Sequence, residues 1–201
     1  MGFVFKDHFV KAEVEVLVIM NALNTCVERV NKNQADAALT RWFGDSSPAW
    51  KKDVAKKLSS MKSIINLQEV HVEFTRLQDR DAGTNAAAAP GMLTSIDPSK
   101  AQTFKGRNVR LDVAFHGLPS RLPLTGGTVD ATGYNQSKLE TVLHELSHAV
   151  LSTKDEKLAN SNTAYGAQQA AALAVENPGL AKTNAENWGI FIEACGVHKS
   201  S

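Results

Sequence analysis

Apolar residues recur at helical spacing through the first third of the chain. Between residues 10 and 67 they fall three or four positions apart, as in Val14, Leu17, Val18, Ala22 and Leu23, and again in Val54, Leu58, Met61 and Ile65. This spacing places them on one face of a helix. A turn cluster over residues 44–48 interrupts the pattern, where Ser46 or Ser47 can cap the helix that Pro48 opens. We predict a helical N-terminal part over residues 1–68.

The pattern changes to strict alternation after residue 69. Apolar and polar positions alternate over residues 70–75 and again over residues 109–115. A period of two is typical of a half-buried strand. Residues 79–102 and 117–136 are rich in Gly, Pro, Ala and Ser, which favours long loops there. We therefore predict a small antiparallel sheet with loops over residues 69–136.

The last third of the chain returns to helical spacing. We predict helices over residues 137–151, 168–176 and 184–195, with Pro178-Gly179 separating the last two. A chain of 201 residues can form a single domain with a sizeable core. The predicted fold class is α+β, in one domain over residues 1–201, with active-site and C-terminal helices over residues 137–201.

Composition narrows the possible partners. The chain has 22 basic and 21 acidic residues and a net charge of +1, which gives no footprint for nucleic acid or an anionic membrane. The apolar stretch from Val14 to Ala22 contains Glu15 and Asn21, so it is too polar to span a bilayer, and it lacks the features of a secretory signal. Cys26 and Cys195 are expected to be buried thiols rather than a disulfide. We expect a monomer that binds neither nucleic acid nor membrane.

The strongest chemical signal is the segment His144-Glu145-Leu146-Ser147-His148. Two imidazoles one helical turn apart can bind the same zinc ion, while the glutamate between them reaches the metal's water. At 100° per residue, the two histidines point away from an apolar stripe formed by Leu139, Val142, Leu143, Leu146, Ala149 and Val150. The helix is thus anchored on one face and carries chemistry on the other. His71 and His116 are expected to be ordinary polar-face histidines.

A catalytic zinc site takes three protein ligands and leaves one position for water. The metzincin pattern is excluded, because it needs Gly and His where this chain has Leu151 and Lys154. Two sources of the third ligand remain open at this point. One is a glutamate on a later helix, for which the candidates on spacing are Glu176, Glu186 and Glu193. The other is a carboxylate close behind the helix, which Asp155 provides.

These residues resemble the aspzincins, the deuterolysin-like or peptidyl-lysine-type metalloendopeptidases. Their pattern continues from His-Glu-x-x-His through Gly-Thr-x-Asp, or the same with one more residue before Asp, to Tyr-Gly. This chain continues with Ser152-Thr153-Lys154-Asp155 and then Tyr165-Gly166. Residues 41–44 and 184–188 resemble other parts of the family, so the likeness runs from about Lys11 to Ala194. Serine replaces the family's glycine at position 152, and the spacers around Asp155 differ in length.

The resemblance implies roles for single residues. Asp155 becomes the favoured third ligand of one Zn2+ per chain, ahead of Glu156 or a later glutamate. Glu145 is the implied general base, and the Tyr165 hydroxyl the implied donor to the oxyanion. Glu186 stands where some members have an acid facing the substrate pocket, which implies a basic residue after the scissile bond.

Residues 108–115 correspond in order to the edge strand on which zincins pair extended substrate. We therefore expect a zinc-dependent endopeptidase that acts on proteins or peptides. A zinc-stabilised binding module without catalysis and a delivered toxin or effector are the alternatives. The family also implies action outside the producing cell, although the chain has no visible signal peptide.

Overall fold

The computed structural model describes residues 3–5, 16–66, 70–74, 86–89, 107–111, 118–122, 124–125, 128–129 and 136–197, with side chains over 17–63, 118–122 and 136–197. Its helices are α2 (Val16–Asn31), α3 (Asp36–Phe43), α4 (Pro48–Asn66), α5 (Lys138–Leu151), α6 (Gly166–Glu176), α7 (Pro178–Ala181) and α8 (Ala185–Val197). Its strands are β1 (Phe3–Phe5), β2 (Val70–Phe74), β3 (Ala86–Ala89), β4 (Arg107–Leu111), β5 (Leu124–Thr125) and β6 (Thr128–Val129).

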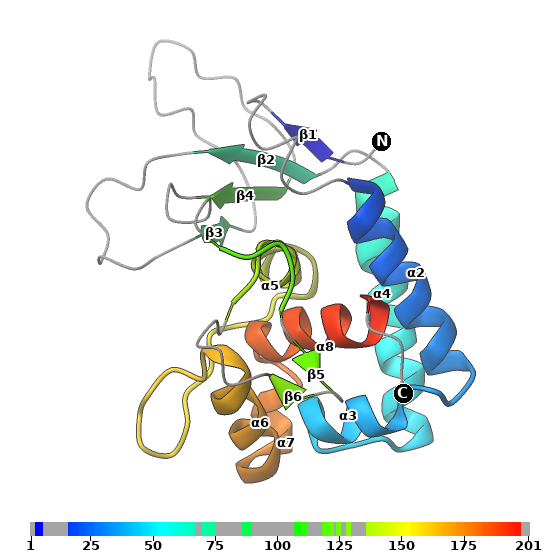
Figure 1. Cartoon of the computed structure of the whole chain (residues 1–201), viewed down its shortest axis with the longest axis vertical. Coiled ribbons are helices and arrows are strands. Elements are labelled where there is room, and N and C mark those ends of the chain that lie inside the picture. Colours follow the sequence, from blue (N-terminus) through cyan, green and yellow to red (C-terminus); the bar gives the residue numbers. More distant parts are fainter. Residues whose placement is uncertain are drawn as a thin grey trace.

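Helix α8 forms the centre of the described helices. It packs against α2, α3, α5 and α6, while α2 and α4 run side by side along one flank (Figure 1). Its sequence is apolar around most of its circumference, as expected for a helix with neighbours on all sides. Every residue from Ala185 to Glu193 is buried. The position of α8 therefore fixes the positions of the helices around it.

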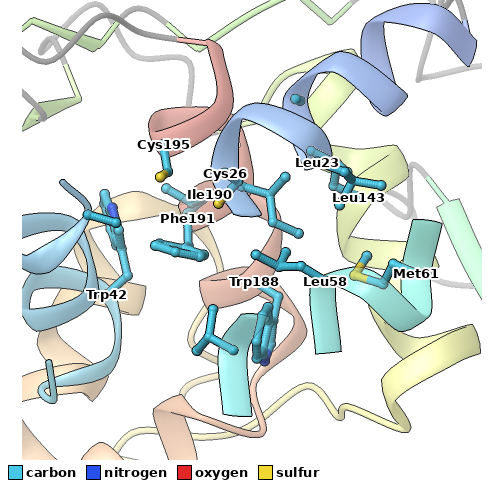
Figure 2. Packing of buried hydrophobic residues seen from close by; sticks show 14 of the residues in the cluster. Leu23, Cys26, Trp42, Leu58, Met61, Leu143, Trp188, Ile190, Phe191 and Cys195 are labelled. Carbon is cyan, nitrogen blue, oxygen red and sulfur yellow. The ribbon is translucent and has the colours of Figure 1, made fainter. Parts of the chain in front are cut away.

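An aromatic cluster joins α8 to α3 and α4. The ring of Phe43 lies 5.3 Å from Trp50, 5.0 Å from Trp188 and 5.1 Å from Phe191, measured between ring centroids. These separations are within the range of favourable aromatic pairs. Figure 2 shows the surrounding aliphatic core, in which Leu23, Leu58 and Leu143 come from three different helices. The core thus connects the N-terminal helices to α5 and α8.

The sequence-predicted helices are present with small shifts at their ends. The N-terminal helical part consists of α2, α3 and α4, and α4 opens at Pro48. The Ser47 hydroxyl accepts a hydrogen bond from the Trp50 backbone N–H at 3.3 Å, which confirms the predicted cap. Helices α5, α6 and α8 lie where the C-terminal periodicity placed them.

The predicted fold class, α+β with a small antiparallel sheet, is wrong. The part of the chain with described side chains, residues 17–63, 118–122 and 136–197, is helical and contains no strand. The backbone strands outside it form a four-stranded sheet in the order β1-β2-β4-β3, where β1/β2 and β2/β4 are parallel and β3/β4 is antiparallel, and a separate antiparallel pair, β5/β6. Alternation identifies a strand but carries no information on the direction of its partner.

The strand that was expected to lie at a sheet edge and pair with substrate is not an edge strand. Residues 107–111 form β4, which is an interior strand with β2 on one side and β3 on the other. Residues 112–116, which include His116, fall outside the described residues. The edge next to β4 is β3, whose backbone lies near α5. Its sequence of four alanines gave no strand signal, because alanine is depleted in strands.

Two expectations from composition concern the cysteines and the membrane. Cys26 on α2 and Cys195 on α8 are free and buried, as predicted. Among the described residues, no helix has the length and apolar character needed to cross a bilayer.

Helices α5 and α8 lie close together at Gly189. A Cβ atom at this position would lie 2.6 Å from Glu140 Oε1, 2.9 Å from the Glu140 carbonyl oxygen and 3.2 Å from His144 Cβ. The absence of a side chain therefore allows α8 to pass directly over the residues of α5 that precede and include His144.

Gly189→Ala should destabilise the protein by about 1–3 kcal/mol, because overpacking a tight contact forces backbone shifts. Urea unfolding of the variant and wild type measures this change. Gly179→Ala is the matched control, since its Cβ would meet only Asn177 Oδ1, at 3.2 Å. Equal unfolding midpoints for Gly189→Ala and wild type would contradict the close approach of α5 and α8.

Candidate metal centre

Helix α5 holds both histidines of the sequence motif. The Ser137 hydroxyl caps its first turn by accepting from the Glu140 backbone N–H at 3.0 Å. His144 and His148 lie one turn apart on the same face, and their Nε2 atoms are 3.1 Å apart. The histidine pair is therefore arranged to bind one ion.

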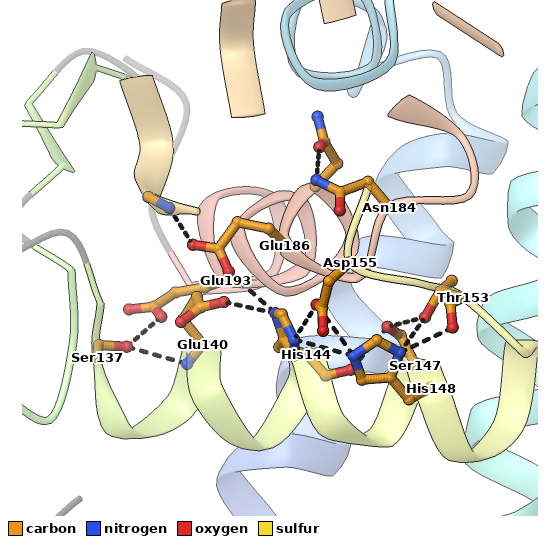
Figure 3. Close-up of polar contacts among 12 residues, drawn as sticks. Ser137, Glu140, His144, Ser147, His148, Thr153, Asp155, Asn184, Glu186 and Glu193 are labelled. Atoms are coloured by element: carbon orange, nitrogen blue, oxygen red, sulfur yellow. Dashed lines mark hydrogen bonds and ion pairs between the residues drawn. The ribbon is translucent and has the colours of Figure 1, made fainter. Parts of the chain in front are cut away.

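Asp155 is brought to the histidines by the segment that follows α5. The helix ends at Leu151 and is capped by Ser152, whose φ of 57° is in the left-handed region. The chain then turns back, and Asp155 Oδ1 lies 3.2 Å from His144 Nε2 and 3.3 Å from His148 Nε2 (Figure 3). In the aspzincin pattern a glycine stands at position 152, where it adopts this backbone more easily than serine. Serine makes the same turn here.

The three ligand atoms have the separations of zinc ligands. Their mutual distances are 3.1, 3.2 and 3.3 Å. Ligand atoms about 2.0–2.1 Å from a tetrahedral zinc lie about 3.3 Å from one another. Two nitrogens and one carboxylate oxygen are also a donor set that zinc accepts. The separations of the three ligand atoms therefore fit a zinc ion.

The outer nitrogen of each imidazole has an acceptor. His144 Nδ1 lies 2.9 Å from Glu186 Oε2, and His148 Nδ1 lies 2.8 Å from the Thr153 carbonyl oxygen. Because neither acceptor carries a hydrogen, each Nδ1 must donate its own. A neutral imidazole then has its lone pair on Nε2, which faces the shared position. Both rings are therefore oriented for metal binding.

Backbone hydrogen bonds anchor the segment that carries Asp155. Lys154 N–H donates to the Thr183 carbonyl, and the Lys154 carbonyl accepts from Ala185 N–H, both at 2.9 Å. The Glu156 N–H donates to Asn184 Oδ1 at 3.0 Å. The start of α8 thus holds Asp155 on both sides, even though its side chain is partly exposed.

Charge in the site follows from burial and proximity. Burial lowers the pKa of His144, but Asp155 and Glu186 outweigh it and raise that pKa well above the ordinary value. Burial raises the pKa of Asp155, while the two histidines outweigh this and lower it. The site thus favours positive charge at His144 and negative charge at Asp155, and a cation bound between them would meet the same electrostatic preference.

Glu145 lies between the two histidines in sequence and is 5% exposed. Its Oε2 has no hydrogen-bond partner among the described groups. Burial raises the pKa of this carboxyl, and the nearby His144 and His148 reduce the shift. A buried carboxyl with a free oxygen beside a metal position can act as a general base.

Tyr165 lies at the start of α6, with its ring centroid 6.1 Å from that of His144. Burial and the charge of Asp155 raise the pKa of its hydroxyl, to which a hydrogen bond with Asp155 contributes. The hydroxyl stays protonated and can donate a hydrogen bond. The structure thus places Tyr165 beside the site despite the long spacer.

Glu186 does not occupy the position expected of a substrate-contacting residue. It is 0% exposed and lies behind His144, with Oε2 directed at His144 Nδ1. Its Oε1 accepts a hydrogen bond from Gly166 N–H at 2.7 Å. Because both oxygens are engaged with the protein in the interior, the carboxylate presents no surface to a substrate.

The other candidates for third ligand have different partners. Glu156 accepts from the exposed Thr183 hydroxyl, and Glu176 accepts from Ala159 N–H. Glu193 accepts from Leu122 N–H and the Ser137 hydroxyl. Among the described residues, Asp155 is the one whose carboxylate lies close to both Nε2 atoms.

Sequence reasoning missed Glu140 and Thr153. Glu140 is fully buried one turn before His144, and its Oε1 lies 3.8 Å from His144 Nδ1. Burial and the neighbouring Glu186 raise the pKa of Glu140 well above its ordinary value. The spacing of four residues from His144 could have indicated Glu140. Thr153 acts through its carbonyl group, which residue type does not reveal.

Comparison with known proteins supports the aspzincin resemblance. Residues 122–193 match an aspzincin family model described as lysine-specific metallo-endopeptidase, and this segment contains α5 through most of α8. No curated protein matches the chain. A solved structure of a zinc peptidase from Grifola frondosa is similar, with a TM-score of 0.59 and 24% identity over 93% of this chain and 96% of the other. This likeness shows that the two chains share a fold.

Asp155→Asn should weaken zinc binding by about 100-fold or more, since even residues behind the ligands contribute about 10–100-fold. Competition with a chromophoric chelator gives the dissociation constant. Asp53→Asn on α4 is the matched control, because Asp53 pairs with Lys57 on the same helix. Wild-type affinity in Asp155→Asn would exclude Asp155 as a ligand.

Proposed function

We propose that this chain is a zinc-dependent endopeptidase of the aspzincin type, with His144, His148 and Asp155 as ligands of one zinc ion. The observation that carries the proposal is the convergence of three ligand atoms at tetrahedral separations, with Glu145 on the same helix turn. The family match over residues 122–193 supports peptide hydrolysis as the reaction.

The proposed mechanism assigns a proton transfer to Glu145. Bound zinc would polarise the substrate carbonyl and lower the pKa of its water toward about 7. Glu145 accepts a proton from the attacking water, and the oxygen of that water bonds to the carbonyl carbon. Glu145 then delivers the proton to the amine nitrogen as the C–N bond breaks. The raised pKa of Glu145 suits a group that both accepts and returns a proton.

Tyr165 is the proposed donor to the oxyanion that forms on the carbonyl oxygen. Its hydroxyl keeps its proton, because burial and Asp155 raise its pKa. The side chain is 47% exposed at the edge of the site, where a substrate can contact it. A hydrogen bond aimed at developing charge is worth more in the transition state than in the ground state.

The alternative of a zinc-stabilised module without catalysis requires a closed site with four protein ligands. Among the described residues, one group of three has its ligand atoms around the position shared by the two Nε2 atoms. Its members are His144, His148 and Asp155. The second group, Glu140, His144 and Glu186, surrounds the other nitrogen of His144. No fourth ligand atom joins the first group within the described part of the chain, and this favours the enzyme.

A preference for a basic residue after the scissile bond was expected from Glu186. The description of the matched family model names lysine specificity. In this chain Glu186 is buried behind a ligand, so we propose peptide hydrolysis without a lysine preference supplied by that residue.

Glu145→Gln should reduce kcat on a casein-type or peptide substrate by about 10²–10⁴-fold, because the amide cannot accept the proton. Zinc content should stay at the wild-type level, since Glu145 is not one of the ligands. Steady-state hydrolysis and metal analysis of the same sample measure both. Wild-type hydrolysis by the Glu145→Gln variant would remove Glu145 from the mechanism.

Tyr165→Phe should lower kcat by about 10²–10³-fold with little change in KM, as expected for loss of one oxyanion donor. The ring and its packing near His144 are retained, so zinc affinity serves as the internal control. An unchanged kcat would show that Tyr165 packs beside the site without taking part.

A further inference from the structure

Glu186 is a buried carboxylate with two donors and no role in the proposed chemistry. One oxygen receives His144 Nδ1 at 2.9 Å, and the other receives Gly166 N–H at 2.7 Å (Figure 3). Its exposure is 0%. A buried carboxylate is costly unless its oxygens are hydrogen-bonded, so both donors are held firmly in place.

The first turn of α8 fixes the position of this carboxylate. Asn184 Nδ2 donates to Asn187 Oδ1 at 2.6 Å, and Asn187 Nδ2 donates to the Ala170 carbonyl at 2.8 Å and the Trp42 carbonyl at 2.5 Å. These bonds tie the start of α8 to α6 and to the end of α3. Glu186 therefore projects from a rigid base toward both of its partners.

The two donors belong to different parts of the site. His144 provides a metal ligand from α5, whereas Gly166 follows Tyr165 at the start of α6. Gly166 has φ 80°, a backbone conformation that glycine adopts without strain. The Glu186 carboxylate thus accepts one hydrogen bond from the imidazole of His144 and one from the backbone next to Tyr165.

The two histidines differ in the acceptor behind them. His148 donates to a neutral backbone carbonyl, whereas His144 donates to a carboxylate. A charged acceptor makes the stronger hydrogen bond and increases the basicity of the opposite nitrogen. His144 is therefore the ligand oriented by a charged side chain, and that side chain is Glu186.

We propose that Glu186 is a positioning residue that aligns His144 for zinc and holds the Tyr165-Gly166 segment beside it. This inference rests on the proposed zinc-peptidase function. It replaces the expectation that Glu186 contacts the substrate. One carboxylate sets two parts of the site at once, so its loss should affect metal affinity and turnover together.

Glu186→Gln is the most informative variant, because it keeps the shape of the side chain and replaces one acceptor oxygen by an NH2 donor. An amide has one oxygen, while two N–H groups face this side chain. One N–H therefore meets an NH2 group and loses its bond. We expect zinc affinity to fall by about 10–100-fold, as for other residues that orient metal ligands. We also expect kcat to fall, with KM little changed.

Two measurements other than activity test the proposed role of Glu186. Chelator competition gives the zinc dissociation constant. NMR of 15N-histidine-labelled, zinc-loaded protein observes the Nδ1–H proton of His144, which should be strongly downfield in wild type and shifted or lost in Glu186→Gln. Glu186→Asp keeps the charge but is shorter by one methylene, so it should restore part of the affinity and serves if Glu186→Gln folds poorly.

Glu193→Gln is the matched control. Glu193 lies on the same helix and is likewise 0% exposed, but it accepts from Leu122 N–H and the Ser137 hydroxyl instead of a ligand. This variant should lose stability while its zinc affinity stays within about twofold of wild type. A general effect of removing a buried charge would lower zinc affinity equally in both variants, and that result would overturn the inference.

Other outcomes separate this inference from the function on which it rests. Wild-type zinc affinity and an unchanged His144 resonance in Glu186→Gln would overturn the positioning role and leave the peptidase intact. A raised KM for substrates with lysine after the scissile bond, with zinc affinity unchanged, would return Glu186 to the substrate pocket. Zinc binding without hydrolysis by the wild type would contradict the proposed function. A loss of zinc affinity in Glu186→Gln would still support the positioning role.

Discussion

The contact between α5 and α8 is the constraint on which the site depends. Gly189 lets α8 pass within van der Waals distance of the Glu140 backbone and His144 Cβ. An apolar helix with neighbours on all sides has to satisfy every polar group that it carries into the interior. Glu186 does so by accepting from His144 and Gly166 at the metal centre, while Asn187 and Glu193 bond to the surrounding segments. Packing of the core and geometry of the site are therefore determined together.

This arrangement explains how a partly exposed aspartate can be placed accurately. The Lys154 backbone bonds to residues 183 and 185, and Glu156 N–H bonds to Asn184, so the start of α8 holds the chain on both sides of Asp155. The same turn of helix provides Glu186 behind His144. Two of the three proposed ligands are thus oriented from α8, although neither belongs to it. Ligand geometry at a metal depends on such supporting contacts as much as on the ligands.

Sequence periodicity predicted the helices and the histidine pair, because a buried face and a metal-binding turn both leave a regular spacing. It failed for the sheet, where alternation over residues 70–75 and 109–115 gave no direction of pairing and the alanines of β3 gave no signal. Spacing left Asp155 as one of several open candidates, and only the family resemblance favoured Asp155 and pointed to Tyr165, since their positions depend on a loop held by long-range bonds. Glu186, expected at the substrate pocket, is buried and bonded to His144, and residue type does not distinguish such an acceptor from an acid in a pocket.

The most direct test of the central claim is a crystal structure of the zinc-soaked protein, with anomalous diffraction measured on both sides of the zinc absorption edge. The account predicts one zinc peak, at about 2.0–2.2 Å from Nε2 of His144, Nε2 of His148 and a carboxylate oxygen of Asp155, with one position left to solvent. A peak elsewhere, or a fourth protein ligand that closes the site, would contradict it.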